Sequence, residues 1–175
     1  MLATMWLNPH GYQLASDIIV MIESTVMETI LQVKFRSAGV VVVRRENDDW
    51  KFLILRCYGN WDFPKGMVEE GEEPLQTALR ETEEETTITD LDFAWGMGFH
   101  ETEPYGAGKV ARYYLAQTSR VDLVLPVNPD LGKPEHEEYR WVNATAAFSL
   151  LPPRLIPILD WASSKLENVQ HAGEF

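Results

Sequence analysis

The chain has 175 residues with 45% hydrophobic residues, which fits one domain with a packed core and excludes a fully disordered protein. Its net charge of −12 argues against broad contact with a nucleic-acid backbone, because such surfaces are basic. No apolar run approaches the ~20 residues that span a bilayer, so we expect no membrane insertion.

Residues 1–34 precede the region in which the pattern of a folded domain begins. Apolar residues recur at helical spacing across residues 17–31, which predicts an amphipathic helix. Two alternatives remain open for this part: an N-terminal extension with that helix, or a chain whose translation starts later, for example at Met27.

A β-hairpin is predicted next, from the apolar residues 37–45 and 50–58 on either side of the polar residues 46–49. The second stretch contains Cys57, the single cysteine, which cannot form an internal disulfide. We expect it to be a small buried residue of a protein in the reducing cytoplasm.

A helix is predicted to begin near Pro74, since proline suits a first helical turn. Its expected core stripe repeats at helical spacing and consists of Leu75, Ala78, Leu79 and Thr82. A separate arc of the same helix carries three carboxylates, those of Glu81, Glu84 and Glu85.

The region around this helix is strongly acidic, with eight glutamates between Gly66 and Ile88. Like charges at this density repel one another unless a cation lies among them. Oxygen-rich clusters suit Mg²⁺ or Mn²⁺, so we expect a divalent metal site here. Arg80 precedes Glu84 by one helical turn, and we expect a bidentate contact between them.

The remaining elements alternate strands with a final helix. We expect strands at residues 91–100, 109–117 and 139–142, a helix capped by Asn143, and a closing helix at residues 154–166. Strands around one helix, with another helix at the end, predict an α/β (α+β) fold: an α/β/α sandwich around a mixed β-sheet.

The acidic segment resembles the Nudix box, the signature of Nudix hydrolases, with the spacing Gly66-x5-Glu72-x7-Arg80-Glu81-x2-Glu84-Glu85-x2-Ile88. The resemblance covers about residues 35–167, leaves 168–175 as a tail, and implies the same sandwich fold. It also implies metal-dependent cleavage of a phosphoanhydride in a nucleoside diphosphate derivative. The implied metal ligands are Glu81, Glu84, Glu85 and the Gly66 carbonyl. Arg80 would hold Glu84, and Glu72 would brace the loop.

One position departs from the box, because Thr87 stands where the family usually has glycine. That glycine ends the helix in a left-handed conformation, which is costly for a β-branched residue. We therefore expect a differently shaped helix end.

The flanking sequence resembles the asymmetrical diadenosine tetraphosphate hydrolases of this family. The similarity lies in Pro64-Lys65-Gly66, in a tyrosine at position 105, and in the run Glu135-His136-Glu137-Glu138-Tyr139-Arg140-Trp141. It implies that Lys65 contacts a polyphosphate and that Tyr105 stacks on adenine.

Residues of the strand at 109–117 are further candidates for substrate binding. Lys109 and Arg112 would line a phosphate channel, and either Tyr113 or Tyr114 would face the cleft, with Tyr114 preferred.

The late glutamate of the family binds another metal ion or acts as general base, and Glu135 is the first choice for it here. Glu137 and Glu138 remain alternatives, and His136 is expected at the surface.

The expected function is hydrolysis of diadenosine tetraphosphate to ATP and AMP with Mg²⁺ or Mn²⁺. Three alternatives remain open: RNA 5′ ends, inositol pyrophosphates or other nucleoside diphosphate derivatives as substrates. A non-catalytic nucleotide sensor is a fourth reading, supported only by Thr87. The partner expected is a small nucleotide, and the oligomeric state is not indicated.

Overall fold

The computed structural model describes residues 35–129 and 131–171, and the helix predicted at residues 17–31 lies outside them. In this described part, seven strands form one sheet in the order β3-β2-β1-β6-β5, with β4 paired to β1 and β9 paired to β2. These strands are β1 (Phe35–Glu46), β2 (Asp49–Cys57), β3 (Asn60–Asp62), β4 (Lys65–Met67), β5 (Phe99–Glu101), β6 (Lys109–Gln117) and β9 (Glu138–Val142). A separate two-stranded sheet joins β7 (Val127–Asn128) to β8 (Lys133–Pro134).

Strand β1 organises the sheet, because it pairs in parallel with β6 and antiparallel with both β2 and β4. The sheet is therefore mixed, as predicted. Gly39 of β1 faces Lys65 of β4, and a Cβ atom at this glycine would lie 2.1 Å from the carbonyl oxygen of Pro64. Only a glycine allows this close approach, which brings the loop before Gly66 onto the sheet.

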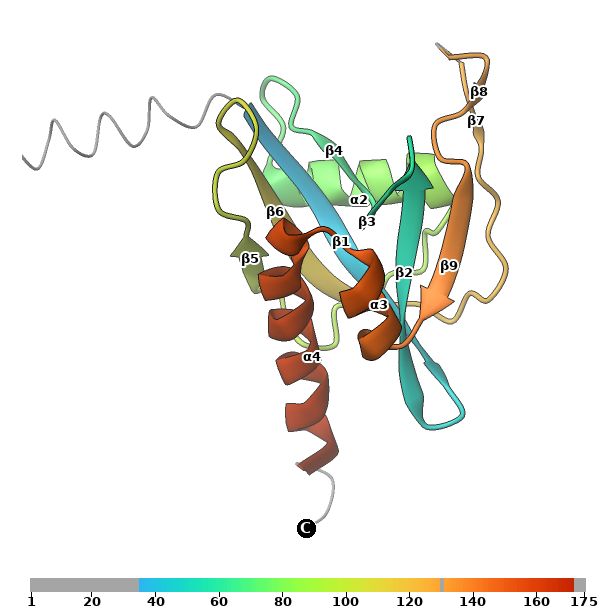
Figure 1. The fold of residues 1–175 in the computed structure, drawn as a ribbon, viewed down its shortest axis with the longest axis vertical. Coiled ribbons are helices and arrows are strands. Elements are labelled where there is room, and N and C mark those ends of the chain that lie inside the picture. The colour runs from blue at the N-terminus through green and yellow to red at the C-terminus, as the bar shows by residue number, and fades with distance from the viewer. Residues whose placement is uncertain (1–34, 130, 172–175) are drawn as a thin grey trace, which may run out of the picture. The chain divides into compact units, whose positions relative to one another are not determined.

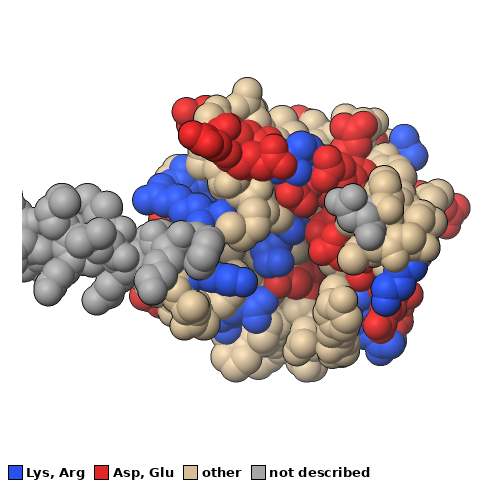
Figure 2. All heavy atoms as spheres, turned by 90° about the horizontal axis from the view of Figure 1, so that it is seen from above, with Lys and Arg blue, Asp and Glu red and all other residues tan. Residues whose placement is uncertain are grey.

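The helices lie on both faces of the sheet (Figure 1). Helix α2 (Pro74–Thr86) covers one face. The other face is covered by α3 (Ala144–Leu150), a 3-10 turn η1 (Pro153–Leu155) and α4 (Ile156–His171). This arrangement confirms the predicted α/β/α sandwich. It also places β3, β4 and α2 at one end of the sheet, where Figure 2 shows many Asp and Glu side chains with Lys and Arg side chains among them.

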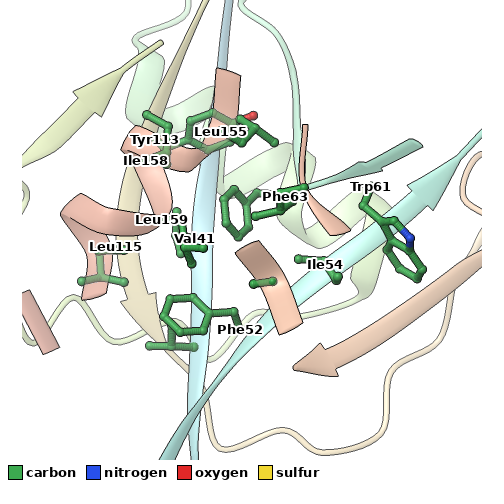
Figure 3. Close-up of a cluster of buried hydrophobic side chains, with 14 of the residues drawn as sticks. Val41, Phe52, Ile54, Trp61, Phe63, Tyr113, Leu115, Leu155, Ile158 and Leu159 are labelled. Carbon is green, nitrogen blue, oxygen red and sulfur yellow. The ribbon is translucent and has the colours of Figure 1, made fainter. Parts of the chain in front are cut away.

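Two hydrophobic cores follow from the alternation of side chains along the strands. Val40 and Val42 of β1 face α2, whereas Val41 and Val43 face α4. The core between the sheet and α4 is the larger one. Figure 3 shows Phe52 of β2 and Phe63, which follows β3, in one cluster with side chains of α4. Because β1 is buried on both faces, it reads as the continuous apolar run seen in the sequence.

The buried face of α2 differs from the predicted stripe. Leu79 is 40% exposed, whereas Ala78, Thr82 and Glu85 are buried. These three positions share one face of the helix, which packs on the sheet. The acidic arc is therefore divided: Glu85 lies against the sheet, and the Glu84 side chain is 59% exposed.

Two further predictions need correction. Only Phe99–Glu101 forms a strand within the region predicted at 91–100, apart from a single bridge between Asp92 and Gln117. The closing helix begins at Ile156, after the turn η1, and continues to His171. The hairpin and the strand Lys109–Gln117 are confirmed.

Candidate active site

A cavity of about 610 Å³ lies beside the C-terminal half of α2. One wall consists of four glutamates of the helix, at positions 81, 83, 84 and 85. The opposite wall consists of residues 125–129 together with Glu135 and His136. The structure thus brings Glu135 to the same cavity as Glu81, Glu84 and Glu85 of the helix. Their role as metal ligands stays a prediction.

Arg80 connects the loop before α2 to the acidic helix. Its guanidinium binds Glu72 in a bidentate manner, with donor–acceptor distances of 3.0 Å from Nε and 2.9 Å from Nη2. Nη1 donates to Glu81 at 2.7 Å and to Glu84 at 3.3 Å. The predicted bidentate contact with Glu84 is therefore wrong, since the fork binds Glu72 and leaves Glu84 a single, longer bond. These contacts lower the pKa of Glu72 to about 2, chiefly through its hydrogen bond with Arg80.

Gly66 lies directly against the carboxylate of Glu81. A Cβ atom at Gly66 would be 1.9 Å from the Glu81 carboxyl carbon, so any other residue would displace this side chain. Burial raises the pKa of Glu81, against the opposing effect of Arg80. Gly66 and Glu81, two of the predicted metal ligands, are therefore close neighbours, and metal binding by them stays a prediction.

Glu85 is the buried member of the cluster, with 8% of its surface exposed. One carboxylate oxygen accepts the backbone N–H of Lys65 at 3.1 Å, and the other lies 3.9 Å from Nε2 of His136. Burial raises the pKa of Glu85 well above its usual range, because desolvation disfavours the charged carboxylate and the charge of Lys65 opposes this only in part.

His136 was expected at the surface, and this prediction is wrong. The side chain is buried beside Glu85, and its Nδ1 has no hydrogen-bond partner. Burial lowers the pKa of the imidazole, which favours its neutral form. The residue comes from a loop, so no periodic pattern in the sequence could have indicated its burial.

Glu135 is the only one of the three late glutamates that lines this cavity. Its carboxylate accepts a hydrogen bond from the Asn128 amide at 3.3 Å, and its backbone oxygen accepts one from the Cys57 thiol at 3.3 Å. Glu137 and Glu138 instead form ion pairs with Arg56. Cys57 is half-buried rather than fully buried, and burial raises its thiol pKa.

Lys65 and Tyr105 belong to a second cluster that adjoins the cavity. Asp62 accepts from Nζ of Lys65 at 3.3 Å and from Nη2 of Arg154 at 2.5 Å. The Arg154 guanidinium lies over the ring of Tyr105, 4.9 Å from its centroid. Sequence reasoning missed Asp62 and Arg154. Asp62 stands beside the predicted Lys65, but Arg154 is 92 residues from Asp62 and lies in a turn without any local signal.

The three candidates from β6 divide between the two faces of the sheet. Lys109 is exposed at the start of the strand, next to Tyr105. Arg112 binds Glu101 of β5 at 2.9 Å, with its guanidinium over Phe99. Tyr114 is 5% exposed and packs edge-on against Phe99, while Tyr113 donates its hydroxyl to Asp62. Lys109 therefore lies nearer the Asp62 cluster than the other two.

Comparison with known protein families matches residues 33–162 to the NUDIX domain. The chain belongs to the Nudix family.

Relatives of this Nudix hydrolase include enzymes with different names. The asymmetrical bis(5'-nucleosyl)-tetraphosphatase of Rattus norvegicus is 33% identical over 127 residues, which cover 66% of this chain and 83% of that relative. The RNA pyrophosphohydrolase of Bartonella bacilliformis is 27% identical over 132 residues, 62% of this chain and 76% of the relative. Among solved structures, a C. elegans Ap4A hydrolase binary complex aligns with a TM-score of 0.67 and 26% identity, over 77% of this chain and 98% of that one.

Nudix enzymes generally use divalent metal ions, and the cavity offers oxygen ligands for one. Within the described residues, no three His, Cys, Asp or Glu side chains converge into a ready-made cage. Mg²⁺ does not require one, since it keeps several waters and takes only one or two carboxylates. The carboxylate beside Gly66 and the buried Glu85, whose charge Lys65 offsets only in part, therefore fit Mg²⁺ or Mn²⁺.

Thr87 ends α2 in the left-handed conformation that the Nudix box assigns to glycine. Its φ is 61° and its ψ 14°, and its backbone N–H donates to the carbonyl of Glu83 at 2.8 Å. The expectation of a differently shaped helix end is therefore wrong, and the only sequence argument for a non-catalytic domain is removed.

A membrane-spanning segment was not expected, and none of the helices at residues 35–129 and 131–171 combines the length and apolar character needed to cross a bilayer.

Proposed function

We propose that this Nudix hydrolase cleaves dinucleoside polyphosphates, and that diadenosine tetraphosphate is its preferred substrate, giving ATP and AMP. The observation that carries this proposal is the similarity to the rat tetraphosphatase, which extends over 83% of that relative. The position of Lys65 and Tyr105 supports it, because both lie in the cluster around Asp62. The backbone N–H of Lys65 also donates to Glu85, which lines the acidic cavity.

Each acidic residue has a definite part in this proposal. Glu81, Glu84 and Glu85 hold the metal together with the Gly66 backbone, and Arg80 fixes the orientation of the Glu81 and Glu84 carboxylates. A bound Mg²⁺ or Mn²⁺ would neutralise charge on the phosphoryl group and lower the pKa of the attacking water. Glu135, oriented by Asn128, stands across the cavity as the acceptor for the water proton.

A second candidate substrate is the 5′ end of RNA, favoured by the similarity to the Bartonella RNA pyrophosphohydrolase. The net charge of −12 disfavours it, because an RNA chain carries many phosphates past the site. Inositol pyrophosphates are a third candidate with no specific observation in their favour.

A substrate panel separates these candidates. The purified chain would be given Mg²⁺ with diadenosine tetraphosphate, triphosphorylated RNA and an inositol pyrophosphate, and the products would be resolved by chromatography. We expect ATP and AMP in equal amounts, at a kcat/KM at least tenfold above that for the other two substrates. A higher kcat/KM for RNA would reject the proposal in favour of the second candidate.

The metal ligands are tested by two neighbouring charge changes on α2. Glu84→Gln should lower kcat by two or more orders of magnitude without affecting folding, since this side chain is 59% exposed. Glu83→Gln is the matched control: it removes the same charge from the same wall of the cavity and should keep near-normal turnover. Equal activity of the two variants would reject the assignment of Glu84.

A further inference from the structure

The cavity beside α2 has two unlike walls. The helix contributes carboxylates, whereas the facing segment, residues 125–129, is mainly apolar. The volume of about 610 Å³ is more than a hydrated metal ion needs and lies in the range of sites that enclose an organic ligand. The residues of the apolar wall are Leu125, Pro126, Val127, Asn128 and Pro129.

Val127 is the exposed apolar side chain on which this wall depends. It lines the cavity with 60% of its surface exposed, while Leu125 is partly buried against the core under α2. Removing apolar surface from water is favourable in proportion to the area covered. A ligand held at the carboxylate wall would therefore gain affinity if an apolar part of it covered Val127.

The apolar wall is held in place by its own backbone. Strand β7 pairs with β8, with Val127 opposite Pro134 (Figure 1). The carbonyl of Asn128 accepts the backbone N–H of Gly132 at 2.9 Å, and Pro126, with its fixed φ, precedes Val127. Since the wall is formed before any ligand arrives, little conformational entropy would be lost on binding.

Tyr105, the residue expected to stack on adenine, serves a different place. It is not among the described residues that line this cavity, and its ring lies against the Arg154 guanidinium in the cluster around Asp62. The apolar wall is therefore available for a second apolar group of the same ligand.

We propose that the segment 125–129, with Val127 at its centre, binds a nucleobase of the substrate while the anhydride is held at the carboxylate wall. The two faces of a base are apolar and its polar groups lie at its edges, so a base covers Val127 without burying an unpaired polar group. A dinucleoside polyphosphate carries a base at each end, one for this wall and one for Tyr105. The identity of the substrate rests on the proposed function; the preference of this wall for a base does not.

The same hairpin also carries the proposed proton acceptor. Glu135 directly follows β8, and its carboxylate accepts a hydrogen bond from Asn128, the residue after Val127. A substitution at Val127 could therefore act through Glu135 instead of through a base. A test needs one probe with a base and one without.

Titration calorimetry in the presence of Mg²⁺ would use two probes that resist hydrolysis. One is the analogue of diadenosine tetraphosphate with methylene groups in place of the bridging oxygens, and the other is methylenediphosphonate, which has no base. Val127→Ser should weaken binding of the nucleotide analogue about fivefold, because apolar contact is lost, and leave methylenediphosphonate unchanged. Unchanged affinity for the analogue, or equal weakening for both probes, would overturn the proposal. Equal affinities of wild type for the two probes would overturn it too, since the bases would then contribute nothing.

Val124→Ser is the matched control. Val124 precedes β7 in the same stretch of chain and is 64% exposed, but it does not line the cavity. The variant loses the same apolar group and should bind both probes like wild type. A loss equal to that of Val127→Ser would mean that the whole stretch, and not this wall, determines the affinity, which overturns the site.

Steady-state kinetics distinguish base binding from an effect on catalysis. With diadenosine tetraphosphate, Val127→Ser should raise KM about fivefold and leave kcat within about twofold, because the contact is made in both ground and transition states. A lower kcat at unchanged KM would overturn the proposal. If wild type does not hydrolyse this substrate but binding of the analogue still depends on Val127, the proposed function fails alone.

Discussion

Thr87 shows how one residue can keep a backbone conformation that its side chain disfavours. A left-handed conformation costs a non-glycine residue about 1–2 kcal/mol, yet the hydrogen bond to Glu83 that closes α2 is present. The neighbouring helix supplies Glu81, Glu84 and Glu85, so the strain lies next to the candidate metal ligands. The sequence indicated strain at Thr87 but not whether the helix end would change shape to relieve it. In the structure the helix end keeps its shape, and Thr87 adopts the unfavourable left-handed conformation.

Replacing Thr87 by glycine should therefore stabilise the protein. Relief of strain exceeds the added entropy of the unfolded chain, and we expect the free energy of unfolding to rise by about 0.5–1 kcal/mol. Urea denaturation would measure it. Thr145→Gly, an exposed substitution in α3, is the control and should lower stability, because glycine disfavours helices. A loss of stability in both variants would contradict the strain argument.

Glu72 ties stability to pH through its hydrogen bonds with Arg80. Its pKa is about 2 in the folded chain, below the ordinary value of 4.5. The unfolded state therefore binds more protons between these values, and the stabilising contribution, present above about pH 5, is lost as pH falls toward 2. We expect Glu72→Gln to flatten this acid limb in urea titrations at several pH values. Glu70→Gln, in the same loop, should retain the wild-type slope.

Among the elements, those with a strong period were predicted well, and those defined by tertiary packing were not. The strand Lys109–Gln117 and the hairpin of β1 and β2 agree with the structure because their apolar residues favour strands and are buried in the sheet. Residues 91–98 alternate in hydrophobicity like a strand. Leu91, Phe93 and Trp95 nevertheless pack into the two cores without a ladder, and Gly96, with φ of 81°, breaks the extended chain.

Helix α3 illustrates an element end that local chemistry determines. Asn143 was predicted as its cap, and its side chain accepts the backbone N–H of Ala146 at 2.9 Å. Because α3 has only seven residues, this one bond is a large part of its stability. Asn143→Ala should lower the free energy of unfolding by about 1 kcal/mol, measured by thermal denaturation, whereas Asn143→Asp should not. Equal losses in both variants would indicate that packing, not capping, holds this helix.

At the scale of the whole molecule, the sequence predicted the residues of the box but not what lies opposite them. Spacing along one helix is local, so Glu81, Glu84 and Glu85 could be recognised directly. The burial of His136 and the contact of Arg154 with Asp62 depend on how distant segments meet, and no local period records that. The division of the acidic arc into a buried Glu85 and an exposed Glu84 likewise depends on which side of α2 meets the sheet.

The same acidic end makes the stability of the molecule depend on metal ions. A chain of net charge −12 with a buried carboxylate at Glu85 repels itself at neutral pH, and a divalent cation that binds only the folded state must stabilise it. At a Mg²⁺ or Mn²⁺ concentration about 100-fold above Kd, the gain is about 2.7 kcal/mol, equivalent to a rise in Tm of about 5–10 °C. EDTA should reverse the rise. Glu84→Gln should lose most of it and Glu83→Gln should keep it, because only the former is an assigned ligand. An equal rise in both variants would mean that the ions act by screening the surface charge, and no rise in wild type would remove the metal site on which the proposed hydrolysis depends.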